Sequence, residues 1–236
     1  MITTLVLLAG GKATRLRPVT ETIPKSLIEV AGKPFIAHQL ELVKKKGINK
    51  VVICASFLGE DIQEYIGNGN LFGIKVEYSF DGEKPLGTGG AIKKALSNLD
   101  DSFFVMYGDS YLDTDFRVIN EYFFSNNKPG LMTVFRNEGN WDKSNIEFEN
   151  GIIINYDKKV YNEKMKYIDY GLGILTHKAF ENFKNKDEFD LELVYKNLLH
   201  ENNLTGFEVK ERFYEIGSFN GLEETRKHLQ SIKDNK

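Results

Sequence analysis

The chain has 236 residues, of which 41% are hydrophobic and 28% charged, ordinary values for a globular protein that buries a core. Its 31 basic and 34 acidic residues leave no basic excess that would point to nucleic acid as a partner. No run approaches the roughly 18 apolar residues of a membrane span, and no signal peptide is predicted. The one cysteine, Cys54, excludes an internal disulfide and suits a reducing compartment, so we expect a cytoplasmic protein.

Short apolar runs alternate with helical patterns through the first half of the chain. The runs cover residues 5–9, 51–55, 74–79 and 103–107, and helices are predicted over residues 35–46, 61–66 and 89–99. This alternation predicts an α/β fold with a Rossmann-like, mainly parallel sheet flanked by helices. Ligands of such sheets lie outside the carboxyl ends of the strands, so the segments after the apolar runs are the candidate site.

The second half is less regular. It predicts helices over residues 115–125, 191–199 and 221–232, strands over 130–136, 167–175, 207–210 and 213–216, and a β-hairpin that turns at Asn150-Gly151. We expect the hairpin and the later strands to form a lid or substrate subdomain within a mixed sheet. No break in composition marks a linker. We therefore predict one domain over residues 1–236, with a nucleotide-binding half (1–110) and an acceptor-binding half (111–236).

Two glycines and two cations follow the first predicted strand. Gly10 and Gly11 let backbone N–H groups approach phosphate oxygens without a Cβ in the way. Arg15 can hold a phosphate through paired hydrogen bonds, and Lys25 adds a second positive charge. The glycines alone would indicate only a turn with solvated neighbours. Together, the four residues favour a triphosphate site, because a leaving pyrophosphate must be neutralised.

A second glycine run, Gly87-Thr88-Gly89-Gly90, precedes a predicted helix. These glycines permit close approach of a flat base or a ribose, and Thr88 can cap the helix and donate a hydrogen bond. A loop followed by an N-cap is the alternative when the run is taken alone. The run is therefore a candidate for base recognition rather than a proof of it.

Asp109 follows the fourth apolar run, in the segment Val105-Met-Tyr-Gly-Asp109. Mg²⁺ prefers one or two protein carboxylates together with phosphate oxygens and water, so a carboxylate at a strand end is a candidate metal ligand. A turn aspartate is the alternative. The four histidines lack metal-ligand spacing, and we interpret them as structural or surface residues.

Three segments carry a resemblance to a known family. Residues 8–20 read Leu-Ala-Gly-Gly-x-x-x-Arg-Leu-x-Pro-x-Thr, residues 24–27 read Pro-Lys-Ser-Leu, and residues 30–34 read Val-Ala-Gly-Lys-Pro. They resemble the N-terminal signature of sugar-phosphate nucleotidyltransferases, in which Gly is usual where this chain has Ala13. The form Pro-Leu-Gly-Thr-Gly-Gly-Ala at residues 85–91 looks most like the heptose 1-phosphate guanylyltransferases.

The resemblance implies roles for particular residues. Arg15, Lys25 and Asp109 would carry catalysis, and Glu215, one methylene longer than the usual Asp, would be a second Mg²⁺ ligand beside Asp109. Lys158 would bind the sugar phosphate, and Trp141 could either stack on a sugar ring or pack in the lid. The residues implied for nucleotide contact are Leu8, Ala9, Gly10, Gly11, Gly87, Thr88 and Gly89, and those for the sugar are Asn145, Asp169 and Tyr170.

The implied reaction joins an NTP and a sugar 1-phosphate into an NDP-sugar and pyrophosphate. We expect direct in-line attack by the acceptor phosphate on the α-phosphorus, with Mg²⁺ as cofactor and catalysis by positioning and charge stabilisation. GTP with a heptose or hexose 1-phosphate is the favoured pair, and a homodimer is expected. The alternatives are a cytidylyl- or uridylyltransferase for a different phosphorylated acceptor, and a non-catalytic regulatory module.

Overall fold

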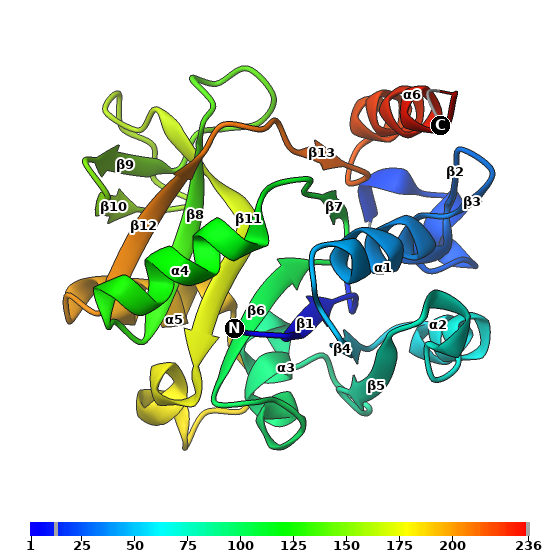
Figure 1. Ribbon diagram of the computed structural model, residues 1–236, viewed down its shortest axis with the longest axis horizontal. Coiled ribbons are helices and arrows are strands. Elements are labelled where there is room, and N and C mark those ends of the chain that lie inside the picture. Colours follow the sequence, from blue (N-terminus) through cyan, green and yellow to red (C-terminus); the bar gives the residue numbers. More distant parts are fainter. Residues whose placement is uncertain (12–13, 235–236) are drawn as a thin grey trace.

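The structure, a computed structural model, describes residues 1–11 and 14–234 and shows a mixed sheet covered by helices (Figure 1). Within these residues, nine strands join the sheet. Seven follow the order β10-β9-β11-β6-β1-β4-β5, and β8 and β12 extend it from β11. Strands from both predicted halves therefore share one sheet, as the α/β prediction requires. Ala13, where the chain departs from the family signature, lies outside the described residues.

The four apolar runs of the first half form the parallel part of the sheet. β1 (Thr4–Leu8) pairs in parallel with β4 (Lys50–Ala55) and with β6 (Ser102–Tyr107), and β4 pairs with β5 (Lys75–Phe80). Every residue of β1 is buried, because helices cover both faces of the sheet. The carboxyl ends of these four strands consequently meet at one edge.

The second half continues the sheet with mostly antiparallel pairs. β11 pairs antiparallel with β6, β8 and β9, whereas β12 runs parallel to β8. The predicted hairpin is present, and its two strands are joined at residues 150–151. The strands are β8 (Gly130–Arg136), β9 (Ile146–Glu149), β10 (Ile152–Tyr156), β11 (Tyr167–Thr176) and β12 (Leu204–Val209).

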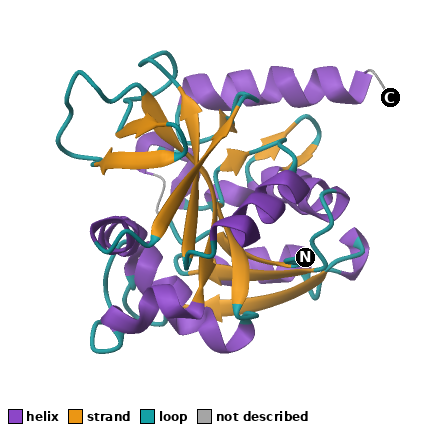
Figure 2. Ribbon diagram, turned by 60° about the vertical axis from the view of Figure 1, so that its left-hand side comes forward, coloured by secondary structure: helices purple, strands orange, loops and turns teal. Residues whose placement is uncertain are grey.

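Helices pack on both faces (Figure 2). Leu5 and Leu7 of β1 face a core shared with α1, α2 and α4, while Val6 and Leu8 face a core shared with α3 and α5. The alternation follows from the two-residue period of a strand. The helices are α1 (Phe35–Lys45), α2 (Gly59–Ile66), α3 (Gly87–Ala95), α4 (Phe116–Asn126) and α5 (Leu191–His200).

The last helix, α6 (Phe219–Asp234), packs outside the main sheet. It contacts the small hairpin of β2 (Glu29–Val30) and β3 (Lys33–Pro34), and also β13 (Tyr214–Glu215). β13 pairs antiparallel with β7 (Ser110–Tyr111). The pairing brings the segment that contains Glu215 beside the end of β6. None of the helices in the described part of the chain has the length and apolar character needed to cross a membrane.

Candidate active site

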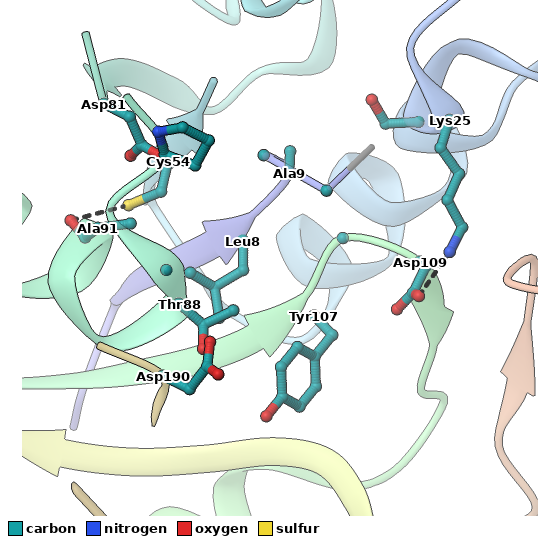
Figure 3. Close-up of a pocket in the computed structure, with 16 residues that line it drawn as sticks. Leu8, Ala9, Lys25, Cys54, Asp81, Thr88, Ala91, Tyr107, Asp109 and Asp190 are labelled. Carbon is teal, nitrogen blue, oxygen red and sulfur yellow. Dashed lines mark hydrogen bonds and ion pairs between the residues drawn. The ribbon is translucent and has the colours of Figure 1, made fainter. Parts of the chain in front are cut away.

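A cavity of about 300 Å³ lies at the carboxyl ends of β1, β4, β5 and β6. Asp81 and Cys54 lie at one end of it, and Lys25 and Asp109 lie at the other (Figure 3). This is the sheet edge at which ligands of parallel α/β folds bind. The lining residues are Leu8, Ala9, Gly10, Gly11, Lys25, Ser26, Cys54, Asp81, Pro85, Gly87, Thr88, Ala91, Tyr107, Gly108, Asp109 and Asp190.

The glycine run at the start of α3 packs against the segment before α5. Gly87 has a φ of 72°, and a Cβ there would lie 2.6 Å from the carbonyl oxygen of Phe189. The backbone N–H groups of Gly89 and Gly90 both donate to that oxygen, at 2.9 and 3.0 Å. The helix therefore begins at Gly87, two residues before the predicted start. Gly89 is buried against the Phe189 ring and does not line the cavity, and its contact with the nucleotide stays a prediction.

Thr88 lines the cavity but does not cap its own helix. Its Oγ1 accepts a hydrogen bond of 2.8 Å from the backbone N–H of Leu191, the first residue of α5. The predicted local cap is therefore wrong, and Thr88 instead satisfies a free N–H at the start of a distant helix. Asp190, the N-cap residue of α5, makes no side-chain cap bond, and its carboxylate lines the cavity.

The end of the cavity at β4 and β5 contains two groups that the sequence interpretation did not assign to the site. Asp81 follows β5 directly, and its Oδ2 accepts a hydrogen bond of 3.1 Å from Leu86 N–H. Burial raises the pKa of the Asp81 carboxyl above its ordinary value. Burial also raises the pKa of Cys54 to about 12, so this thiol stays protonated and is a structural part of the wall.

Lys25 and Asp109 form an ion pair at the opposite end. Lys25 Nζ lies 2.7 Å from Asp109 Oδ2, and the side chains are 14% and 35% exposed. Lys25 begins a 3₁₀ turn, Lys25–Leu27, and Asp109 lies between β6 and β7. Ser110 Oγ adds a hydrogen bond of 3.3 Å to Asp109 Oδ1. The two predicted catalytic residues are thus in direct contact, although 84 positions apart in the sequence.

Arg15 and Glu215 lie beside this ion pair, outside the cavity lining. A Cβ placed on Gly217 would be 2.6 Å from Glu215 Oε2 and 3.2 Å from both Arg15 Nη2 and Lys25 Nζ. Glu215 accepts hydrogen bonds from Gly217 N–H and from Ser218 Oγ, the latter at 2.7 Å. The structure therefore brings all four predicted charged residues together around one loop.

These residues fit a magnesium ion. Within the described residues no cluster of three His, Cys, Asp or Glu side chains could hold a metal. Mg²⁺ needs only one or two carboxylates when phosphate oxygens and water complete its shell. Asp109 already holds a cation, the Lys25 ammonium, at 2.7 Å. Glu215 lies close to the same ammonium, and each of its oxygens keeps a second lone pair.

The predicted acceptor residues form a second group around Tyr107, at the end of β6. Lys158 Nζ donates to the Tyr107 hydroxyl at 3.2 Å and lies 3.7 Å from Asp169 Oδ2. Asn145 Oδ1 accepts from the backbone N–H of Asp169 at 3.0 Å, and Tyr156 donates to Asp169 Oδ2 at 3.3 Å. Burial, reinforced by the Asp169 carboxylate, raises the pKa of Tyr107 well above its ordinary value. Tyr107 therefore links the acceptor group to the cavity.

Tyr170 does not belong to this group. It is 2% exposed and packs against Phe135 and Phe213 in the core on the α1 side of the sheet. Adjacent residues of a strand point to opposite faces, so Tyr170 faces away from Asp169. Its predicted sugar contact is wrong for this reason. Trp141 also packs against Phe135 and Phe213, but it remains 43% exposed.

The sequence interpretation did not assign several of the cavity-lining residues to the site. For some of these residues, their position in the sequence indicated a place near the site. Asp81 and Asp190 stand at the end of a predicted strand and the start of a predicted helix, where site residues of such folds gather. Tyr107 lies two residues before Asp109. Ser26 Oγ is buried and has no hydrogen-bond partner within the described residues, which only the structure reveals.

Two guanylyltransferases are similar in sequence to most of this chain. The D-glycero-alpha-D-manno-heptose 1-phosphate guanylyltransferase of Campylobacter jejuni is 32% identical over 79% of this chain and 82% of its own length. The enzyme of that name from Aneurinibacillus thermoaerophilus is 30% identical over 95% of this chain and 97% of its own.

Solved structures give the same picture. HddC from Yersinia pseudotuberculosis, complexed with GMP-PN, superposes with a TM-score of 0.81 at 25% identity, covering 97% of this chain and 100% of that one. The model of the family described as "Nucleotidyl transferase" matches residues 4–231. The chain therefore belongs to the nucleotidyl transferase family.

Proposed function

We propose that this chain transfers a nucleoside monophosphate from an NTP to a sugar 1-phosphate, with GTP and a heptose or hexose 1-phosphate as its substrates. The observation that carries the proposal is the continuity of the site. One cavity extends from Gly10 and Gly11 to Lys25 and Asp109, and it includes Tyr107, whose hydroxyl contacts Lys158. A donor and an acceptor phosphate can therefore meet beside Asp109.

The charge distribution suits the donor. A triphosphate is strongly anionic, and its oxygens can be met by backbone N–H groups at Gly10 and Gly11 and by the cations Lys25 and Arg15. The nucleobase would then extend toward Asp81 and Gly87, at the other end of the cavity. This orientation leaves the α-phosphate near Tyr107 and Asp109.

The chemistry is an in-line displacement at the α-phosphorus. An oxygen of the acceptor phosphate forms the new P–O bond, and the bond to the β-phosphate breaks, releasing pyrophosphate. Lys158 aligns the acceptor phosphate, and Lys25 and Arg15 neutralise the charge on the leaving group. Mg²⁺ held by Asp109 and Glu215 would supply further charge neutralisation at the reacting phosphates. No covalent intermediate is required, because a phosphate oxyanion is already nucleophilic at neutral pH.

The choice of GTP rests on the guanylyltransferase relatives and on the GMP-PN complex of HddC. Release of pyrophosphate should be measured with Mg²⁺, each of GTP, CTP, UTP, ATP and dTTP, and a panel of sugar 1-phosphates that includes a heptose. We expect GTP with one acceptor to give the fastest release. Faster turnover with CTP or UTP would replace the guanylyl assignment, and no release with any pair, together with no NTP binding, would refute an enzyme of this class.

Two further proposals accompany this one. The buried, protonated Cys54 thiol is compatible with a reducing compartment, which supports action in the cytoplasm. The homodimer stays a prediction, and sedimentation of the purified protein would test it.

A further inference from the structure

The ammonium group of Lys25 contacts one of the two carboxylates predicted as metal ligands and lies near the other. Lys25 Nζ lies 2.7 Å from Asp109 Oδ2. Gly217 lies close to both Lys25 and Glu215. A Cβ on Gly217 would lie 3.2 Å from Lys25 Nζ and 2.6 Å from Glu215 Oε2. Lys25 therefore forms its ion pair with Asp109, and Glu215 lies nearby without an ion pair to Lys25 among the described residues.

We propose, on the basis of the proposed function, that Lys25 is a counterion of the metal site. Its ammonium pairs with Asp109 in the nucleotide-free protein and moves to the triphosphate when the NTP binds. Asp109 can then take a metal only together with the nucleotide. Lys25 would thus make metal binding at Asp109 depend on prior or simultaneous binding of the NTP, in addition to neutralising the leaving group.

The geometry of Lys25 favours this exchange. Its ammonium is a compact point charge on a flexible stem, so it can move between two acceptors without a change in the backbone. At 2.7 Å from Asp109, and 14% exposed, the pair is stronger than an open surface ion pair. Mg²⁺ gives up its water reluctantly, so a free ion gains little by displacing the ammonium. A triphosphate carries several negative charges and competes for Lys25 far better.

Arg15 offers a matched comparison. A Cβ on Gly217 would lie 3.2 Å from Arg15 Nη2, the same distance as from Lys25 Nζ. Arg15 therefore contributes a second positive charge near Glu215. Within the described residues, however, the ion pair of Asp109 is made with Lys25. Replacing Arg15 by Met removes one positive charge but leaves the ion pair of Asp109 with Lys25 in place. Replacing Lys25 by Met removes one positive charge and also the ion pair.

The test is a titration of the full-length, nucleotide-free protein with Mn²⁺, with free Mn²⁺ followed by electron paramagnetic resonance. Lys25→Met and Arg15→Met are compared with the unaltered protein. We expect weak binding to the unaltered protein, binding about tenfold tighter in Lys25→Met, and a change of less than about threefold in Arg15→Met. In the double variant Lys25→Met, Asp109→Asn the gain should disappear.

Three results would overturn the proposal. These are tight Mn²⁺ binding by the unaltered protein without nucleotide, no gain in Lys25→Met, or an equal gain in Arg15→Met, which would reduce the effect to net charge. Lys25→Gln provides a second variant if Lys25→Met does not fold, as judged by circular dichroism. Because the titration contains neither NTP nor sugar phosphate, it gives its answer even if the acceptor has been assigned wrongly.

Discussion

At the residue scale, the ion pair of Lys25 and Asp109 should control turnover. In the proposed mechanism, Asp109→Asn removes the charge that would bind the metal, and Lys25→Met removes a cation that would neutralise the leaving pyrophosphate. We expect kcat to fall by at least about a hundredfold in each variant, because both groups act on charge that develops in the transition state. Pyrophosphate release measures the loss. Asp101→Asn and Lys45→Met, at exposed positions, are the matched controls and should keep normal turnover.

The acceptor side depends on Lys158 and Tyr107. Lys158→Met should raise the KM for the sugar phosphate, because it removes the cation that is proposed to bind the acceptor. Tyr107→Phe removes only the hydroxyl that accepts from Lys158 at 3.2 Å, so we expect a smaller rise of about fivefold. Steady-state kinetics at saturating NTP would separate KM from kcat. Lys159→Met alters the exposed neighbour and should leave KM unchanged; a rise equal to that of Lys158→Met would shift the role by one residue.

At the element scale, Thr88 connects two helices. Its Oγ1 accepts from the first N–H of α5, 103 residues further along the chain. Thr88→Val keeps the shape of the side chain but leaves that N–H without its partner, and we expect the free energy of unfolding to fall by about 1 kcal/mol. Urea denaturation measures the change. Thr88→Ser keeps the hydroxyl and should retain most of the stability, whereas a loss in Thr88→Ser equal to that in Thr88→Val would contradict the role of the hydroxyl.

Local patterns explain why most elements could be predicted. β1 was recognised because a strand covered on both faces is continuously apolar, and α4 because Asp115 caps it through the N–H groups of Arg117 and Val118. β2, β3 and β7 were missed because two-residue strands show no periodicity. The start of α3 and the cap from Thr88 depend on the segment before α5, so no local pattern could reveal them.

The segment after β10, which contains Lys158, is tied to α5 by charge. Lys196 lies 2.8 Å from both Asp157 and Glu192. Its hydrogen bond, with those from the backbone of Val160 and Lys159, lowers the pKa of Asp157 from an ordinary value of 3.8. A lowered folded-state pKa means that the stabilisation is fully present above about pH 4, begins to weaken below that pH, and is lost only as the pH passes through the lowered folded-state pKa.

Asp157→Asn should therefore destabilise the protein at pH 7, and the difference should become smaller as the pH falls below about 4. Asn keeps the acceptor for the backbone N–H groups but removes the charge opposite Lys196. Both partners are partly exposed, so we expect a loss of only about 0.5 kcal/mol at pH 7. Denaturation of both proteins at pH 7 and pH 3 tests this. A difference that stays the same at pH 3 would show that turn geometry, not charge, is responsible.

At the scale of the whole molecule, β6 joins the two halves. It pairs in parallel with β1 on one side and antiparallel with β11 on the other. Tyr107 at its end contacts the cavity and also Lys158. The grouping of Arg15, Lys25, Asp109 and Glu215 was implied by the family resemblance. The approach of Arg15, Lys25 and Glu215 at Gly217, however, depends on β13 pairing with β7, which the sequence did not predict.

Because the proposed nucleotide and acceptor sites are formed by different residues and meet at Tyr107, binding of the NTP can be measured separately from binding of the sugar phosphate. GTP with Mg²⁺ should raise the melting temperature of the unaltered protein and of Lys158→Met by the same amount, because the proposed function assigns Lys158 to the acceptor phosphate and Lys158 itself does not line the cavity. Saturation at a hundred times Kd stabilises a folded protein by about 2.7 kcal/mol, which a thermal melt detects readily. In Lys25→Met the shift should shrink, since a cation for the triphosphate is gone. If Lys158→Met also lost the shift, the nucleotide would extend across β6 into the acceptor group, and the boundary between the two sites would have to move to Asp169.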